Sequence, residues 1–259
     1  MRFLVGVVAL ALAGCVGRES SGKDTSDAVA ATAAADERAS VTPGAADSSP
    51  TTGAGARAPA PGSDASARPT VLILGTSLTA GLGLDPEDAY PAVLQRMADS
   101  AGFAVRIVNG GLSGETSAGA LRRLQWILRG GAAMVVVETG ANDGLRGLDP
   151  DSTRANLTAI VRAIRGQLPA ARVVLVQMEA PPNLGTDYTR RFREMYGTVA
   201  RSEGVGLAPF LLENVAGVSR LNQGDGIHPT AEGAKVVAGN LWPALEPHFR
   251  ALAQGQESR

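Results

Sequence analysis

The sequence predicts an α/β fold in which a mostly parallel sheet lies between two layers of helices. Four largely apolar runs recur along the chain, at residues 71–74, 105–108, 134–137 and 172–176. Such runs are typical of strands that are buried on both faces. Helical segments lie between them, and this alternation indicates a parallel sheet. Functional residues of such folds gather where the strands end.

Two of the intervening segments space their apolar residues by three and four, which places those residues on one face of a helix. The first segment contains Leu157, Ile160, Val161, Ile164 and Leu168. The second contains Tyr188, Phe192, Met195, Tyr196 and Val199. We therefore expect one amphipathic helix in each segment.

The bulk composition limits the partners of the chain. It has 259 residues, 24 basic and 25 acidic side chains, and a net charge of −1. This length favours one domain, or two at most. Without a basic run or a net positive charge, the chain has no field that would gather nucleic acid or an anionic membrane. We expect a small, roughly neutral substrate, no nucleic-acid partner and a monomer.

The first fifteen residues have the order of a secretory signal: Met1 and Arg2, an apolar run at 3–13, and small residues before Cys15. The run is shorter than the roughly 20 residues that span a bilayer. Residues 12–15 (LAGC) resemble the bacterial lipobox, which implies a signal peptide over residues 1–14 and a lipidated Cys15. An ordinary signal peptide with a cysteine is the alternative. We expect an exported, membrane-anchored lipoprotein. Because Val16 and not Asp follows Cys15, the outer membrane is the expected location in a cell with two membranes.

A change of composition marks a tether after Cys15. Residues 16–68 are mainly Ala, Ser, Thr, Gly, Pro and Asp, without Leu, Ile, Met or an aromatic residue. Such a segment buries too little apolar surface to offset the entropy lost on ordering. We predict a disordered tether over residues 15–68, with a reach of roughly 40 Å, and a folded domain over residues 69–259.

Four segments rich in Gly and short polar residues carry the chemistry. They are residues 75–78 (GTSL), 109–116 (NGGLSGET), 139–144 (TGANDG) and 225–229 (DGIHP), and the first three follow predicted strands. Each is a weak signal alone, because Gly often serves turn geometry. Together they supply the parts of acyl transfer: a nucleophile, a base with an orienting carboxylate, and donors for an oxyanion.

The candidate base is His228, one of two histidines in the chain. His248 lies on a predicted terminal helix and is most simply a surface residue. Asp225 precedes His228 by three residues, so its carboxylate can reach the imidazole; a turn or helix-terminus role is the alternative. The chain lacks the Gly-x-Ser-x-Gly elbow of α/β-hydrolases. Two histidines and one cysteine are too few for a zinc site, and no nucleotide-binding motif occurs, so we expect neither metal nor cofactor.

In this order, the four segments resemble blocks I, II, III and V of the SGNH (GDSL-like) hydrolase family, over residues 70–253. The likeness is strongest to bacterial acyl-CoA thioesterases, arylesterases and lysophospholipases. It implies a three-layer α/β/α sandwich with a five-stranded, flavodoxin-like sheet. Ser77 is then the nucleophile, His228 the base and Asp225 its orienting residue, while Ser77, Gly114 and Asn142 form the oxyanion hole.

The chain departs from the family pattern in one position. Block I usually has Asp before the serine, where this chain has Thr76. That Asp is not a triad member, so the departure puts the positioning of Ser77 in question and not the reaction. An acyl pocket is expected from loop and strand-end residues, with ordinary packing as the alternative for each. These residues are Leu78, Leu112, Leu145, Pro181 and Ile227.

We expect a serine esterase that hydrolyses carboxylic esters with short or medium acyl chains and aryl esters, with lysophospholipids or acyl thioesters as further substrates. Two alternatives stay open. One is a carbohydrate O-deacetylase of the cell envelope, which would use the same triad. The other is a catalytically silent lipoprotein that binds an acyl group or a glycan, and the presence of both Ser77 and His228 disfavours it.

Overall fold

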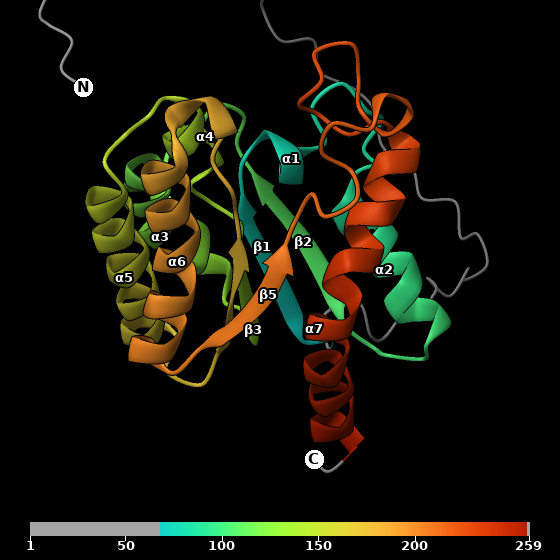
Figure 1. Cartoon of the computed structure of the whole chain (residues 1–259). Coiled ribbons are helices and arrows are strands. Elements are labelled where there is room, and N and C mark those ends of the chain that lie inside the picture. The colour runs from blue at the N-terminus through green and yellow to red at the C-terminus, as the bar shows by residue number, and fades with distance from the viewer. Residues whose placement is uncertain (1–67, 258–259) are drawn as a thin grey trace, which may run out of the picture. The chain divides into compact units, whose positions relative to one another are not determined.

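A computed structural model describes residues 68–257 of the chain, and the predicted signal peptide, Cys15 and nearly all of the predicted tether lie outside them. Five strands form one sheet in the order β2-β1-β3-β4-β5, and every described pair is parallel (Figure 1). This is the flavodoxin-like order. The strands are β1 (Thr70–Gly75), β2 (Arg106–Gly111), β3 (Met134–Val137), β4 (Arg172–Gln177) and β5 (Gly206–Phe210).

Helices cover both faces of this sheet. On one face lie α2 (Tyr90–Ser100) and α7 (Ala231–Glu257), and on the other α3 (Ser117–Ile127), α5 (Pro150–Gln167) and α6 (Thr186–Glu203) (Figure 1). Two short helices, α1 (Ser77–Ala80) and α4 (Ala141–Leu145), begin close after β1 and β3. Single 3-10 turns are η1 (Leu128–Gly130), η2 (Pro182–Leu184) and η3 (Ser219–Leu221). None of the described helices is long and apolar enough to cross a membrane.

The buried strands explain why the site forms where it does. All of β3 and nearly all of β1 are buried, because helices cover both faces of the sheet. Leu74 is in register with Gly110 of β2 and with Val137 of β3. The three strands therefore end side by side, and the polar segments that follow them meet at one edge.

The sequence correctly predicts the fold class and four of the strands, but it does not locate β5. This strand reads GLAPF, and its burial is interrupted: Ala208 is buried while Leu207 and Pro209 are exposed. β5 pairs only with β4, so it is an edge strand, where a proline removes no needed hydrogen bond. An edge strand with one mostly open face does not show the continuous apolar run of a central strand.

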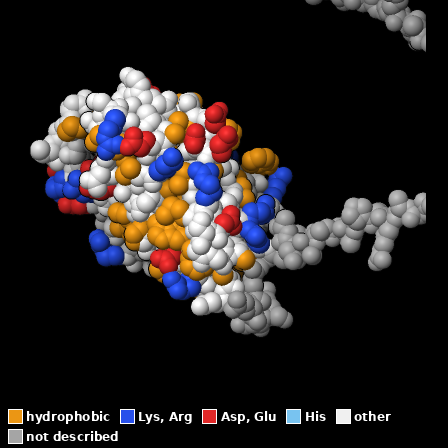
Figure 2. Space-filling view, turned by 90° about the vertical axis from the view of Figure 1, so that its right-hand side faces the viewer, with side chains coloured by type: hydrophobic (Ala, Val, Ile, Leu, Met, Phe, Trp, Pro, Cys, Tyr) orange, Lys and Arg blue, Asp and Glu red, His pale blue; other side chains and the backbone are white. Residues whose placement is uncertain are grey.

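The side of the molecule that carries α2 and α7 presents much apolar surface. Figure 2 shows hydrophobic side chains gathered across the middle of this face, with Lys, Arg, Asp and Glu around them. A shallow groove there is lined by Val93 and Met97 of α2 and by Lys235 and Trp242 of α7. The site described next lies at the carboxyl edge of the sheet and not in this groove.

Candidate active site

The residues predicted from the four polar segments come together at the carboxyl edge of the sheet. Ser77 follows β1 as the first residue of α1. Gly114 lies between β2 and α3, and Asn142 lies in α4, just beyond β3. Asp225 and His228 belong to the loop that precedes α7. A parallel sheet thus brings together residues that lie 151 positions apart in the chain.

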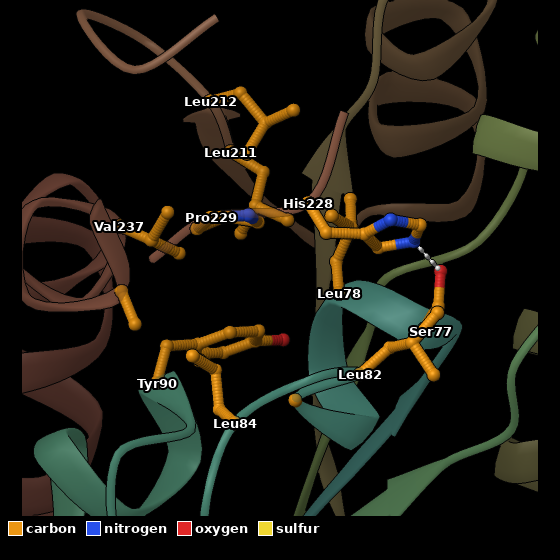
Figure 3. Close-up of a pocket in the computed structure, with 12 residues that line it drawn as sticks. Ser77, Leu78, Leu82, Leu84, Tyr90, Leu211, Leu212, His228, Pro229 and Val237 are labelled. Carbon is orange, nitrogen blue, oxygen red and sulfur yellow. Dashed lines mark hydrogen bonds between the residues drawn. The ribbon is translucent and has the colours of Figure 1, made fainter. Parts of the chain in front are cut away.

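Ser77, His228 and Asp225 form one chain of hydrogen bonds. Ser77 Oγ lies 2.9 Å from His228 Nε2, as the dashed line in Figure 3 shows. His228 Nδ1 lies 2.6 Å from Asp225 Oδ2. An ionised carboxylate can only accept, so Nδ1 carries the proton and Nε2 accepts from the Ser77 hydroxyl. This tautomer is the one that a general base for a serine requires.

The turn that carries Asp225 also fixes its charge. Its Oδ1 accepts hydrogen bonds from the backbone N–H groups of Ile227 and His228, at 2.9 and 3.0 Å. The hydrogen bond from the His228 ring, followed by those from the two backbone groups, holds the pKa of Asp225 well below its usual range. The carboxylate is therefore ionised beside the imidazole at neutral and mildly acidic pH.

The three predicted oxyanion donors each have an N–H group available. The backbone N–H groups of Ser77 and Gly114 donate no hydrogen bond to any residue that the structure describes. Gly114 has a φ of 76°, and a Cβ built on it meets nothing within 4 Å, so the backbone conformation and not packing favours glycine there. Asn142 Nδ2 donates to the carbonyl of Glu115 at 3.0 Å, which leaves the second N–H of the amide free.

A buried carboxylate, Glu138, holds the loop that carries Ser77. The Thr76 N–H donates to Glu138 Oε2 at 2.8 Å, and Thr76 Oγ1 donates to Oε1 at 3.0 Å. Thr79 Oγ1 donates to Oε2 at 2.7 Å and lies 2.6 Å from the Tyr90 hydroxyl. Since the Thr79 proton points to the carboxylate, Tyr90 is the donor of that second bond. Glu138, the residue after β3, thus holds the first turn of α1 through these hydrogen bonds.

Sequence reasoning missed Glu138. It directly follows the apolar strand β3 and is fully buried. Burial raises the pKa of its carboxyl to about 7, and the hydrogen bonds from Thr76 and Thr79 oppose that rise. The available signal was one acidic residue continuing a buried strand, since such a group must find donors inside the protein.

Two further acidic residues fix the segments that carry Gly114 and Asn142. The Glu115 carboxylate accepts from Arg123 Nε at 2.7 and 2.9 Å, which ties the segment after β2 to α3. Asp143 is buried and accepts from the N–H and hydroxyl of Ser117, at 2.8 and 2.5 Å, and from Thr153 at 3.2 Å. It joins α4 to α3 and α5. Neither role was predicted.

An apolar cavity lies beside Ser77 and His228, towards α2 and α7 (Figure 3). Its accessible volume is about 10 Å³, the room of about one water molecule, so an acyl group enters it only if side chains move. The cavity is lined otherwise by Leu78, Gly81, Leu82, Leu84, Tyr90, Leu211, Leu212, Pro229, Ala234 and Val237.

The five predicted pocket residues are not gathered in one cavity. Leu78 lines the cavity beside the candidate triad, whereas Leu112 lines a separate, open hollow. Leu145 and Ile227 are exposed, and Pro181 is half-buried. The cavity is built instead from α1, α2, α7 and the loop after β5, and motif positions do not reveal how those side chains pack.

The described residues offer no metal site, and His248 lies away from the candidate triad. Among residues 68–257, no three His, Cys, Asp or Glu side chains are grouped as a metal would require. His248 lines a hollow with Arg172 and Gly206 at the amino ends of β4 and β5, the opposite edge of the sheet. It is half-buried, with its Nδ1 shielded, rather than a surface residue.

Residues 73–236 match the GDSL-like lipase/acylhydrolase family. The chain belongs to this family. It is therefore a hydrolase of the carboxylic ester class, and its β2-β1-β3-β4-β5 sheet is the fold that the resemblance implied.

Similar proteins of known function or structure cover about 70% of this family member. It is 41% identical over 183 residues to "Esterase TesA" of Pseudomonas aeruginosa, which covers 70% of this chain and 90% of the relative. It is 35% identical over 184 residues to "Thioesterase 1/protease 1/lysophospholipase L1" of Escherichia coli strain K12, covering 71% and 86%. The crystal structure of TesA shares 41% identity at a TM-score of 0.66, covering 69% of this chain and 98% of its own. The esterase AlinE4, of the SGNH-hydrolase family, shares 38% identity at a TM-score of 0.59, covering 70% and 96%.

Proposed function

We propose that the chain hydrolyses carboxylic esters with short or medium acyl chains, including aryl esters, through Ser77, His228 and Asp225. The observation that carries this proposal is the chain of hydrogen bonds from Ser77 Oγ through His228 to Asp225, at 2.9 and 2.6 Å. Relatives named esterase, arylesterase and thioesterase/lysophospholipase support an ester or thioester substrate.

In the first half of the proposed reaction, Ser77 Oγ attacks the ester carbonyl while His228 Nε2 takes its proton. Asp225 stabilises the imidazolium that forms, because its ionised carboxylate lies against Nδ1. The negative charge on the carbonyl oxygen is met by the free N–H groups of Ser77, Gly114 and Asn142. His228 then gives the proton to the leaving alcohol, and the acyl group stays on Ser77.

In the second half, water attacks the acyl-enzyme. His228 Nε2 removes a proton from that water, and the same three N–H groups stabilise the second oxyanion. Breaking the bond to Ser77 Oγ returns the proton to the serine and releases the carboxylic acid.

Replacing Ser77 tests the proposal directly. Ser77→Ala should lower the turnover of p-nitrophenyl acetate by at least about 10⁴-fold, because no other side chain in the proposed site supplies the nucleophile. Ser100→Ala, at an exposed serine in α2, is the matched control and should retain activity. A fluorophosphonate probe should label the wild type and not Ser77→Ala. Turnover by Ser77→Ala would overturn the proposal, and a wild type that neither turns over esters nor takes the label would indicate a binding protein.

The acyl specificity can be measured with the full chain and a series of p-nitrophenyl esters of increasing acyl length. Because side chains must move before an acyl group enters the cavity beside Ser77, we expect kcat/KM to be highest for short and medium p-nitrophenyl esters and to fall for long ones. Acetate release from an acetylated glycan, together with poor activity on all p-nitrophenyl esters, would contradict the esterase proposal and identify an O-deacetylase.

We further propose that the enzyme is exported and anchored by a lipid on Cys15, which rests on the sequence of residues 1–15. An alkyne-tagged fatty acid fed to producing cells should label the wild-type chain, and Cys15→Ser should abolish both the label and the recovery of the chain with membranes. Export without labelling of the wild type would show that residues 1–14 are an ordinary signal peptide.

A further inference from the structure

A second, open hollow lies beside Gly114, outside the candidate triad. Its volume is about 430 Å³, a size usual for small-ligand sites. It is built by the segment after β2, the first half of α3 and the residue that follows α4. The lining residues are Leu112, Ser113, Gly114, Glu115, Thr116, Gly119, Arg122, Arg123 and Arg146.

The hollow carries an excess of positive charge. Of its three arginines, only Arg123 is neutralised, by Glu115 at 2.7 Å. Arg122 is exposed and forms no hydrogen bond or ion pair with the residues that the structure describes. Arg146 is also exposed, and its only described bond is to a backbone carbonyl, at 3.0 Å. Two guanidinium groups therefore line the hollow without a carboxylate partner.

The hollow adjoins the proposed reaction centre through Gly114. The N–H of Gly114 is one of the proposed oxyanion donors, while its carbonyl accepts the hydrogen bond from Arg146. A substrate whose carbonyl lies at Ser77 therefore needs only a short linker to place another group between Arg122 and Arg146. Ser113 and Thr116 add hydroxyl groups to the same wall.

We propose that this hollow is a subsite for a phosphate group joined to the scissile ester by a short polyol, as in a lysophospholipid. Guanidinium groups match the planar, bidentate recognition of phosphate oxygens, and hydroxyl groups supply further donors. The inference rests on the proposed esterase function and deepens it, because it names the side chains that would select a phosphate-bearing ester over a neutral one. A thioester carrier also bears phosphate, but at the end of a long arm that would extend well past Gly114.

The test uses substrates that share an acyl chain and differ in charge. With the full chain, kcat/KM is measured for 1-octanoyl-lysophosphatidylglycerol and for 1-octanoylglycerol, and likewise for octanoyl-CoA and the neutral thioester of N-acetylcysteamine. The phosphate of the lysolipid should raise kcat/KM by about tenfold, the effect of one or two charge-assisted hydrogen bonds. Inorganic phosphate should inhibit lysolipid hydrolysis competitively.

Variants of matched charge locate the effect. Arg122→Gln should reduce the ratio of kcat/KM for lysolipid over monoacylglycerol by about threefold, because it removes one of the two charged donors that together raise that ratio about tenfold. Arg129→Gln makes the same change of net charge at an exposed arginine of η1, outside the hollow, and should leave the ratio unchanged.

Each other result counts against the inference in a distinct way. A ratio near one in the wild type, or one equal in the wild type and Arg122→Gln, overturns the subsite while the esterase function stands. If octanoyl-CoA is preferred over the neutral thioester while the lysolipid is not preferred over 1-octanoylglycerol, the phosphate is not joined by a short linker and the inference is wrong. If neither p-nitrophenyl acetate nor any of the four substrates is hydrolysed, the esterase proposal itself is overturned. Turnover of p-nitrophenyl acetate alone overturns only the inference that rests on it.

Discussion

Thr76 directs both its backbone N–H and its hydroxyl to Glu138, so the carboxyl group that holds the Ser77 loop belongs to the residue after β3 and not to the loop itself. Thr79 adds a third donor one turn later, and all three side chains are fully buried. In the sequence, Thr76 stands where the family usually has Asp, which leaves open what holds Ser77 in place. In the structure, Glu138 from the neighbouring strand end holds the loop through Thr76.

The buried Glu138 makes folding stability depend on pH. The pKa of its carboxyl is about 7 in the folded chain against an ordinary value of 4.5, chiefly because of burial. Between these values the unfolded chain loses the proton first, so this group destabilises the fold increasingly as pH rises from 4.5 through 7 and no further above it. The full effect is about 3 kcal/mol. Glu138→Gln has no proton to lose and should show a smaller decline in unfolding free energy between pH values of about 5 and 8.

Urea unfolding at several pH values measures this difference. Glu213→Gln changes an exposed carboxyl in the same way and should leave the pH dependence of the wild type in place. Parallel curves for the wild type and Glu138→Gln would show that Glu138 does not titrate differently in the folded chain.

Replacing Asn142 should slow the reaction without a large loss of folding stability. Asn142→Ala removes one proposed oxyanion donor and should lower kcat on p-nitrophenyl acetate by about 10²–10³-fold, with a smaller change in KM. Asn240→Ala is the matched control, because it also removes an amide that donates to backbone carbonyls, in α7. Equal kcat values for Asn142→Ala and the wild type would exclude the amide from the oxyanion hole.

At the scale of whole elements, the sequence predicts site residues that lie within one short motif. It misses residues whose role depends on how separate elements pack together. The segments at 75–78 and 225–229 could be identified because their residue types and spacing are contiguous. Glu138 and Asp143 could not be assigned, since their partners lie on other elements: Thr76 follows β1, and Ser117 begins α3. The shape of the substrate cavity depends in the same way on how α2 and α7 pack, which periodicity does not give.

Helix α6 shows how an element remote from the reaction supports the site. Phe192 is fully buried between Tyr188 and Tyr196, with ring centroids 6.0 and 5.9 Å away. A Cβ built on Gly144 of α4 would lie 3.1 Å from the Phe192 ring, so α6 packs directly under the helix that carries Asn142. Phe192→Ala should therefore lower the unfolding free energy by about 3–5 kcal/mol and also reduce kcat.

The matched control for that substitution is Trp126→Ala, which truncates an aromatic residue of α3 that is 65% exposed. It should change the unfolding free energy by no more than about 0.5 kcal/mol and leave kcat unchanged. Urea unfolding and p-nitrophenyl acetate turnover measure both variants. A Phe192→Ala protein that is destabilised but fully active would show that α4 keeps its position without α6.

Considered as a whole, the chain has nearly balanced charge, and the two arginines of the hollow that lack a carboxylate partner, Arg122 and Arg146, share it with Gly114 of the proposed oxyanion hole. A net charge of −1 creates no long-range field, so ionic strength should hardly affect a neutral substrate. A phosphate-bearing substrate experiences the local field of Arg122 and Arg146, which salt screens because both side chains are exposed.

Raising NaCl from about 0.01 to about 0.1 M shortens the Debye length from about 30 to about 10 Å. We expect kcat/KM for lysophosphatidylglycerol to fall over this range while that for p-nitrophenyl acetate stays constant. An equal fall for both substrates would place the salt effect on the fold or the triad, and no fall for either would show that the arginines do not act on the substrate.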